Sequence, residues 1–512
     1  MAQAPEIKII RAGKLAVEFL GANLGAIRFG GVEVLRGISY LVRDENWGTV
    51  PAKVSGLKIT PNSIAYTAKA GSLTMKAHID LSPDSLVFTV RTTPGTPFKT
   101  NRTGFVVLHP ASLAGKPLTV THTDGTVEKA KFPKLISPGQ PFFKIRALEH
   151  APAAGIKARV LMEGNTFEME DQRNWSDASY KTYVCSLLDP WPYELPAGQE
   201  FAQKITLSLK GKPPGKTAAK PAKIILKSRL PQIGFAVPAS EVKATLERVK
   251  EIKALRPSHL LGQLDGTQDV AQAYARLARE TGVPVALEIV LPAQASAGQE
   301  MAAMASQIKS AGLQPESIVI TQAHDLKSFQ PGMPRPWGPT YEEMAAAARQ
   351  HFPGVTLGGG MISNFTELNR KRPPAGLFDF ITHSTCPIVH DASDAAVMQT
   401  LEALPAIFAS TKAFIGKTPY HLGPTSIGAR MNPYGADVAR NPRNERVCLA
   451  PNDPRQMTVF AVQWNKGVIA AAAKAGLKRL TLSAITGPQG LFDPKGRPTP
   501  LYRFFAGLRR ER

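Results

Sequence analysis

The hydrophobic and polar positions of the chain follow two different patterns in its two halves. Residues 1–210 consist of short apolar–polar runs separated by Gly, Pro, Asn and Asp, among them KLAVEFL, GAIRFGGVEVLRGISYLV, LTMKAHIDL, SLVFTVRT, GFVVLH and LTVTHT. A period of two places one face of a strand toward a core and the other toward water. Short strands between closely spaced turn residues predict an antiparallel β-sandwich for this half.

From residue 231 onward, strand-like runs alternate with amphipathic helical stretches such as SEVKATLERVKEIKAL and TYEEMAAAARQHF. The expected strands are 233–237, 259–264, 284–291, 317–321, 355–359, 378–382, 419–423 and 479–485. Eight alternations over about 280 residues predict a (β/α)₈ TIM barrel for residues 231–512. An open doubly wound sheet is the alternative. No Gly-rich phosphate turn follows its first strand, however, and GGGM at 358–361 is not GxGxxG.

Residues 211–230 lie between the strand-rich first half and the second half, in which strands and helices alternate. Seven lysines and no acidic residue occur from Lys204 to Lys227, and Pro and Gly interrupt them. Such a composition favours an extended, solvated linker. The chain is therefore divided into a β-domain at 1–210, a basic linker at 211–230 and a barrel at 231–512.

The composition of the chain also indicates the cellular compartment in which we expect the protein. A chain of 512 residues is longer than one ordinary core. Its three cysteines, Cys185, Cys386 and Cys448, match neither a metal-binding spacing nor a disulfide framework, which is typical of a reducing compartment. The N-terminus has no signal-peptide pattern, and no run of about 18 apolar residues occurs. We expect a cytoplasmic protein with no membrane partner.

The net charge of +22 comes from 62 Lys and Arg against 40 Asp and Glu. These basic residues are dispersed, and no helix-turn-helix, zinc-finger or RNA-recognition pattern accompanies them. We therefore expect no nucleic-acid partner; the charge suits solubility or the attraction of anionic small molecules. The pattern indicates no particular oligomeric state.

The site of a TIM barrel lies at the C-terminal ends of its strands. Asp265 follows the second strand there, and Glu288 lies within the third. Strand parity turns Glu288 into the barrel, because the apolar face that should pack on the helices is formed by Val285, Leu287, Ile289 and Leu291. A buried carboxylate is costly unless it is paired. Two roles stay open for Glu288: catalysis or ligand binding, and an ion pair with an Arg inside the barrel.

The fifth and sixth strands lead into further candidates. GGGMISNFTELNR contains glycines that permit close backbone approach to a ligand, followed by Glu367, for which a plain position on a helix face is the alternative. THSTCPIVHD places His383, His390 and Asp391 in one loop, and a histidine beside a carboxylate suits general base chemistry. Two histidines seven residues apart with no third ligand do not favour a metal site. We expect no metal and no cofactor.

The seventh strand continues as HLGPTSIGARMNPYG, in which His421, Arg430 and Asn432 offer hydrogen bonds to a polyhydroxy or carboxylate ligand. A structured loop with capped turns is the alternative for these residues.

Long motifs in both halves resemble one known family. They are FEMEDQRNWSDASYKTY, NRTGFVVLHP, THTDGT and FPKLISPGQPFF in the first half, and GGGMISNFTELNRKRPP, PIVHDASDAAVMQTLEALP, GPTSIGARMNPYG and NDPRQ in the second. Together they resemble bacterial D-apionate lactonases over most of the chain. This sequence departs from the family at Val389-His390-Asp391, where other members often have VHA, and it ends at LYRFFAGLRRER, where members continue into a further β-domain.

The resemblance implies hydrolysis of a five-membered sugar-acid lactone to the open acid, with the small-molecule lactone as the partner. A carboxylate or histidine would activate water, and Arg, Asn or backbone N–H groups would stabilise the oxyanion. One alternative is a TIM-barrel glycoside hydrolase that uses Glu288 and Glu367 as paired carboxylates, and another is a catalytically silent carbohydrate-binding protein. The resemblance also makes the polar cluster at 171–177 a family signature, and we expect it to form a polar corner facing the barrel, with Trp175 as its packing anchor.

Overall fold

The computed structural model describes residues 7–213, 230–267, 269–435 and 437–508. Its contacts divide the chain into two units, Met1–Arg173 with Ala178–Ala222, and Asn174–Asp177 with Lys223–Arg512. Residues 214–229, most of the predicted linker, lie outside the described residues. Each unit is considered by itself below.

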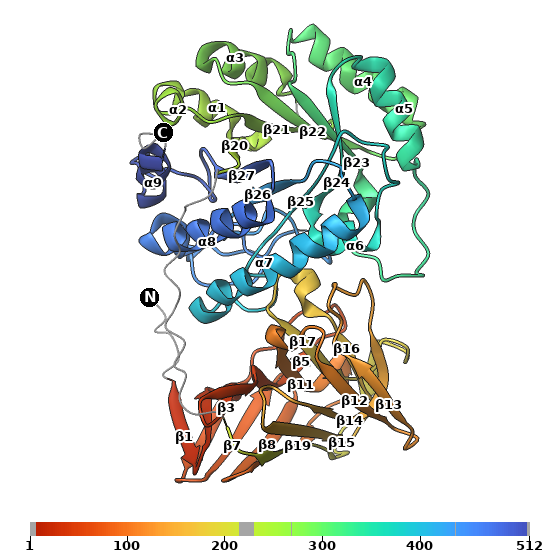
Figure 1. Ribbon diagram of the computed structural model, residues 1–512, viewed down its shortest axis with the longest axis vertical. Coiled ribbons are helices and arrows are strands. Elements are labelled where there is room, and N and C mark those ends of the chain that lie inside the picture. Colours follow the sequence, from red (N-terminus) through yellow and green to blue (C-terminus); the bar gives the residue numbers. More distant parts are fainter. Residues whose placement is uncertain (1–6, 214–229, 268, 436, 509–512) are drawn as a thin grey trace. The chain divides into compact units, whose positions relative to one another are not determined.

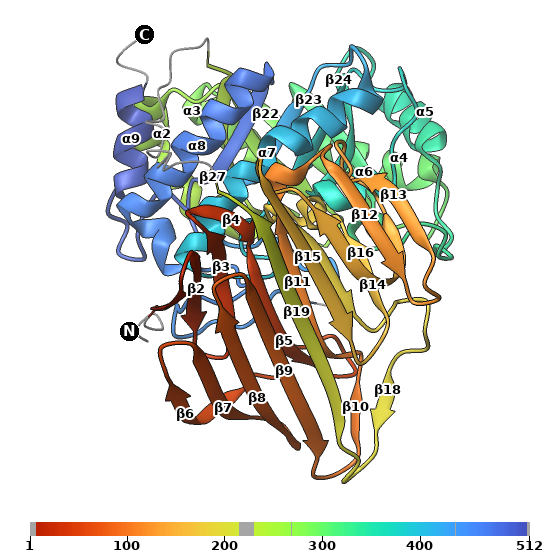
Figure 2. The same cartoon turned by 60° about the horizontal axis from the view of Figure 1, so that its bottom comes forward.

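The first unit is built on one large antiparallel sheet whose long strands β6 to β9 and β19 run side by side (Figure 2). A small separate ribbon joins β10 to β18. The strands are β1 Lys8–Ala12, β2 Leu15–Leu20, β3 Asn23–Phe29, β4 Val32–Leu35, β5 Gly37–Arg43, β6 Lys53–Ile59, β7 Ser63–Ala70, β8 Leu73–Ser82, β9 Ser85–Pro94, β10 Phe98–Thr100, β11 Arg102–Pro110, β12 Pro117–His122, β13 Val127–Lys131, β14 Phe142–His150, β15 Ile156–Glu163, β16 Phe167–Glu170, β17 Ser179–Val184, β18 Tyr193–Leu195 and β19 Phe201–Gly211.

Alternation of side chains explains the core of this unit. In β8, Leu73, Met75 and Ile79 are buried, whereas Lys76 and His78, which point to the other face, are exposed. The buried faces of many strands join in one continuous hydrophobic cluster. The predicted antiparallel, sandwich-like first half is therefore confirmed.

The polar cluster after β16 is buried rather than solvated. The short 3₁₀-helix Gln172–Trp175 follows Asp171, whose carboxylate lies 2.7 Å from the guanidinium of Arg173. Arg173 is 1% exposed and also donates to the carbonyl of Pro133 at 2.8 Å. A buried ion pair with further hydrogen bonds explains why so many polar residues occur together here.

The second unit is a closed parallel barrel. Its strands are hydrogen-bonded in the order β25-β24-β23-β22-β21-β20-β27-β26. Parallel bridges Ile381–Tyr420 and Thr385–Thr425 then join β25 to β26 and close the ring. The strands are β20 Gln232–Ala236, β21 Leu260–Leu264, β22 Val285–Leu291, β23 Ser317–Gln322, β24 Thr356–Asn364, β25 Phe380–Ser384, β26 His421–Thr425 and β27 Arg479–Ala484. The predicted TIM barrel is confirmed.

Helices connect successive strands and cover the outside of the barrel (Figure 1). They are α1 Val242–Leu246, α2 Val249–Leu255, α3 Ala271–Thr281, α4 Ala297–Ser310, α5 Tyr341–His351, α6 Phe365–Arg370, α7 Asp394–Ile415, α8 Val459–Ala475 and α9 Pro500–Leu508. Within the described part of the chain, no helix combines the length and the apolar character needed to cross a bilayer.

The glycines at 358–360 correct one expectation. They lie inside β24, which runs on to Asn364, whereas the expected strand ended at Gly359. A Cβ atom on Gly358 would overlap the ring of Phe380, and one on Gly360, whose φ is 111°, would overlap the carbonyl oxygen of Thr382. These glycines therefore allow β24 to pack closely on β25, whereas the sequence had suggested close approach to a ligand.

Gly360→Ala should lower the free energy of unfolding of the barrel by roughly 3 kcal/mol, because it combines a disfavoured φ with overpacking against backbone. Gly298→Ala is the matched control: Gly298 lies within α4 with open space around its Cα, so alanine should stabilise it by up to about 1 kcal/mol. Urea denaturation followed by circular dichroism measures both changes. Equal stability of the two variants would contradict the packing role of Gly360.

Candidate active site

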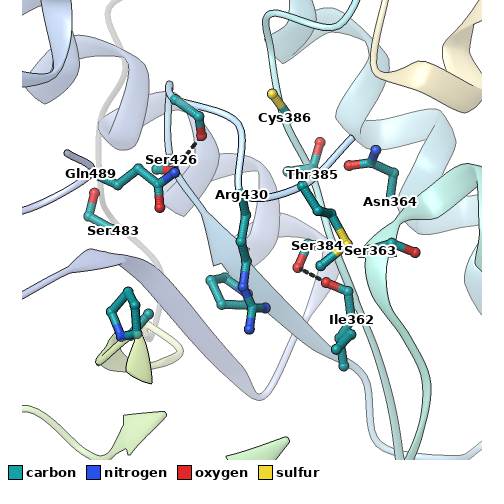
Figure 3. A pocket seen from close by; sticks show the side chains of 15 residues that line it. Ile362, Ser363, Asn364, Ser384, Thr385, Cys386, Ser426, Arg430, Ser483 and Gln489 are labelled. Carbon is teal, nitrogen blue, oxygen red and sulfur yellow. Dashed lines mark hydrogen bonds between the residues drawn. The ribbon is translucent and has the colours of Figure 1, made fainter. Parts of the chain in front are cut away.

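The C-terminal ends of the barrel strands surround a hollow (Figure 3). Because the strands are parallel, residues that follow their last positions meet at one face of the barrel. The wall contains Ala236, Pro238, Ile362, Ser363, Asn364, Ser384, Thr385, Cys386, Pro424, Ser426, Gly428, Arg430, Met431, Ser483 and Gln489. We call this hollow the barrel pocket.

Arg430 is the charged residue of that wall, and Glu288 holds it. The guanidinium Nη1 lies 3.0 Å from Glu288 Oε1, Nη2 bonds the second carboxylate oxygen, and Nη2 also donates to Gln263 Oε1 at 3.1 Å. The Glu288 side chain is 1% exposed and that of Arg430 is 23% exposed. Burial raises the pKa of Glu288, and the charge of Arg430 acts against that shift. Two roles were left open for Glu288: catalysis or ligand binding, and an ion pair with an arginine. In the structure Glu288 forms the ion pair.

His390 lies in the loop after β25 and bonds a carboxylate distant in sequence. Its Nδ1 is 2.7 Å from Oδ2 of Asp177, and each of the two side chains is 19% exposed. The adjacent Asp391 is exposed and accepts a hydrogen bond from the backbone N–H of Ser393 at 2.7 Å, just before α7. Asp177 therefore holds the imidazole, whereas Asp391, the carboxylate that the sequence suggested beside His390, caps a turn.

Asp177 ends a short segment, 174–177, that belongs by its contacts to the barrel unit. The hydroxyl of Ser176 bonds that of Thr385, a residue of the barrel pocket. Asn174 accepts from the Thr366 hydroxyl at 2.7 Å, through its carbonyl oxygen. The segment therefore lies against the residues that follow β24 and β25.

Trp175 anchors this segment, being 2% exposed. Its ring lies 4.9 Å from that of Tyr434 and 6.0 Å from that of His390, and the Arg370 guanidinium lies 5.7 Å from its centre. Packing by Trp175 was expected from the sequence, whereas the bond between Asp177 and His390 was not. Two acids flanking an aromatic residue were the only sequence signal for it.

Two predicted site histidines lie away from the barrel pocket. His383 is inside β25, fully buried, and its Nε2 lies 2.6 Å from the hydroxyl of Tyr420; burial lowers its pKa to about 4. His421 is the first residue of β26, stacks on Phe380 at 4.1 Å, and has its pKa lowered to about 3 by burial. His383 was expected in the loop after the sixth strand, and His421 was expected within the seventh strand, at 419–423, as a donor to a ligand. The strands begin and end about two residues later than predicted, which corrects both placements.

Asp265 and Asn432 hold the turns in which they lie. Oδ1 of Asp265 accepts from the backbone N–H of Thr267 at 2.9 Å, directly after β21. Asn432 accepts from the N–H groups of Tyr434 and Gly435 and donates to the carbonyl of Asp437 at 2.9 Å. In the structure Asn432 therefore caps a turn of its loop, which was the alternative to a role in ligand binding.

Glu367 lies on α6 in a different charged network. It is fully buried, and burial raises its pKa against the charges of Lys371 and Arg370. Lys371 donates to the carbonyl of Asp325 at 2.6 Å, and burial lowers its pKa to about 8. No contact recorded among the described residues joins Glu367 to Glu288. Nor does the described part of the chain contain three His, Cys, Asp or Glu side chains grouped to hold a metal ion.

Two neutral residues of the barrel pocket, Ser483 and Gln489, were not found from the sequence. Ser483 has a φ of 61° and accepts from Gln456, and Gln489 donates to the carbonyl of Ala429 at 2.7 Å. Such residues carry no motif, and they reach the pocket only through loop geometry. Cys386 also lines it, but burial raises the pKa of its thiol to about 12, so a reactive thiolate is disfavoured.

Two solved structures show distant likenesses to this chain. β-Glucuronidase from Ruminococcus gnavus has a TM-score of 0.37 and 10% identity, covering 90% of this chain and 68% of that one. The Slr1438 protein from Synechocystis sp. PCC 6803 has a TM-score of 0.31 and 10% identity, covering 41% and 99%. At these scores the likenesses carry no argument about function.

Comparison of sequences is decisive. The model of the D-apionate lactonase N-terminal domain matches residues 1–212, and that of the D-apionate lactonase TIM barrel domain matches residues 233–512. The D-apionate lactonase of Brucella anthropi is 43% identical, over 96% of this chain and 84% of that protein. The chain therefore belongs to the D-apionate lactonase family, as its motifs indicated.

Proposed function

We propose that this protein hydrolyses the lactone of a sugar acid of the D-apionolactone type and releases the open aldonate. Family membership is the observation that carries this proposal, since the relative from Brucella anthropi is named a D-apionate lactonase. In the reaction, the oxygen of water bonds to the lactone carbonyl carbon. The bond from that carbon to the ring oxygen then breaks, leaving a carboxylate, a hydroxyl group and one released proton.

In this proposal His390 is the general base and Asp177 its positioning residue. With the Nδ1 proton donated to Asp177, Nε2 is the nitrogen that accepts a proton from water and returns it to the leaving ring oxygen. The segment that carries Asp177 contacts Thr385 of the barrel pocket through Ser176, which supports a place for the pair at the pocket's edge. The carboxylate also stabilises the imidazolium that forms during the reaction.

Arg430 is proposed to bind the carbonyl oxygen as negative charge develops on it. A guanidinium has five N–H donors, and three of those of Arg430 are engaged by Glu288 and Gln263, which leaves two for a ligand. Glu288 is then a positioning residue. Fixed donors aimed at a developing oxyanion cost no reorganisation during the reaction.

Glycoside hydrolysis is not favoured. A retaining glycosidase needs two carboxylates about 5 Å apart that flank the sugar bond. Here Arg430 binds Glu288, while Glu367 lies among the charges of Lys371 and Arg370. The family name also points to a lactone rather than to a glycoside.

A substrate panel tests the function. Five-membered aldonolactones should release acid at a rate far above their spontaneous hydrolysis, whereas aryl glycosides should release no phenol. Base consumption at constant pH and absorbance measure the two reactions. Cleavage of aryl glycosides would restore the glycosidase hypothesis, and binding without turnover of either class would support a carbohydrate-binding protein.

Asp177→Asn should lower kcat by about 100-fold, because the amide no longer fixes the imidazole tautomer or stabilises its charged form. Asp391→Asn is the matched control, and its rate should stay within about twofold of the wild type because Asp391 caps a turn. Initial rates of acid release at saturating lactone measure both, with circular dichroism to verify folding. A folded Asp177→Asn protein that turns over as fast as the Asp391→Asn protein would remove His390 and Asp177 from the mechanism.

A further inference from the structure

Arg102, the first residue of β11, is a buried cation without an acidic partner. It is 8% exposed, and its guanidinium carbon lies 3.8 Å from the centre of the Tyr183 ring. Its Nε is buried without a hydrogen-bond acceptor, and within the described ranges no carboxylate pairs with it. A buried charge is costly unless it is paired, and stacking on a ring offsets only part of that cost.

Two other arginines of the chain show what a buried guanidinium usually requires. Arg173 is 1% exposed and bonds both carboxylate oxygens of Asp171. Arg455 is 4% exposed and bonds both carboxylate oxygens of Asp453. Arg102 is nearly as buried as these two, yet among the described residues no carboxylate bonds its guanidinium.

The β10–β18 ribbon brings Trp191 to the side of Arg102. Thr100 pairs with Tyr193 at its end, so Arg102 and Trp191 lie two residues beyond that pair on adjacent chain segments. The Tyr193 hydroxyl accepts from the backbone N–H of Thr103 at 3.0 Å, which fixes this arrangement. Arg102 and Trp191 therefore leave the same end of one ribbon.

Trp47 contacts the cation, and Trp191 packs against Trp47. The ring of Trp47 lies 5.3 Å from the Arg102 guanidinium and 5.4 Å from the ring of Trp191. Trp191 is 44% exposed, and Leu188 in the same segment is 69% exposed. Next to Arg102 in the chain, the side-chain oxygen of Asn101 is buried without a partner, although its amide donates to the carbonyl of Glu45. An unused donor, an unused acceptor and exposed aromatic surface are the parts of a small-molecule site.

We propose that Arg102, Trp47 and Trp191 form a second binding site, for a carboxylate-bearing sugar, within the first unit. The guanidinium binds the carboxylate, for which its planar fork is suited, and the tryptophan faces pack against the apolar C–H groups of the sugar. The choice of a sugar over another carboxylate rests on the proposed function, whereas the need for an anion follows from Arg102 alone.

Calorimetric titration of the full-length protein with D-glucuronate tests the site, with D-glucose and inorganic phosphate as comparison ligands. Arg102→Gln should weaken binding at one site by roughly 30-fold or more, because it removes the charged partner of a buried pair. Trp191→Ala should weaken the same site by about 10-fold, since an aromatic anchor is lost. Arg91→Gln is the control: Arg91 is a 59% exposed cation of the same unit paired with Glu200, and binding should not change.

A folded Arg102→Gln protein that binds D-glucuronate as the wild type does would overturn the proposal. Trp191 is partly exposed, so Trp191→Ala decides the question if Arg102→Gln fails to fold; unchanged binding in it also overturns the site. Equal binding of D-glucose would exclude carboxylate recognition, and equal binding of phosphate would exclude the sugar. Arg102-dependent binding in a protein that turns over no lactone would contradict only the proposed function.

Discussion

The ion pair between the buried Glu288 and the partly exposed Arg430 imposes the constraint on which the barrel pocket depends. The Glu288 carboxylate, on β22, is 1% exposed and needs a cation as its partner. That cation, Arg430, lies in the loop after β26, and β26 is not a neighbour of β22 in the barrel. The pair therefore ties that loop to the inside of the barrel. Removing one member of such a pair typically costs about 3–5 kcal/mol because the other charge stays buried. The barrel pocket thus contains a guanidinium whose position is set by the fold.

The 174–177 segment supplies a second constraint, and it acts through packing. Trp175 is almost fully buried among Tyr434, Arg370 and His390, so the backbone of the segment has little freedom. Asp177 follows two residues later and meets His390 at 2.7 Å. The aromatic anchor thereby positions a carboxylate that the barrel sequence itself does not provide.

Strand order and strand parity were predictable, whereas strand ends were not. The period of two predicted the β-domain, and the strand–helix alternation predicted the barrel. Strand parity alone predicted that Glu288 points into the barrel. A shift of about two residues at β25 and β26 was enough to bury His383 and to move His421 to the far end of its strand. Pairings between distant segments could not be predicted from the sequence either. Arg430 was predicted as a hydrogen-bond donor but not as the partner of Glu288. Asp177, 213 residues before His390, was read as part of a packing corner.

A double-mutant cycle on Glu288 and Arg430 tests most directly whether the carboxylate acts through the guanidinium. The measurement is kcat/KM for an aldonolactone in the wild type, Glu288→Gln, Arg430→Met and the double variant, each verified as folded. Each single change should lower kcat/KM by roughly 30-fold or more, and the double variant should be no worse than Arg430→Met alone, because the two groups act as one unit. Losses that multiply in the double variant would show that Glu288 and Arg430 act independently, and would contradict this account.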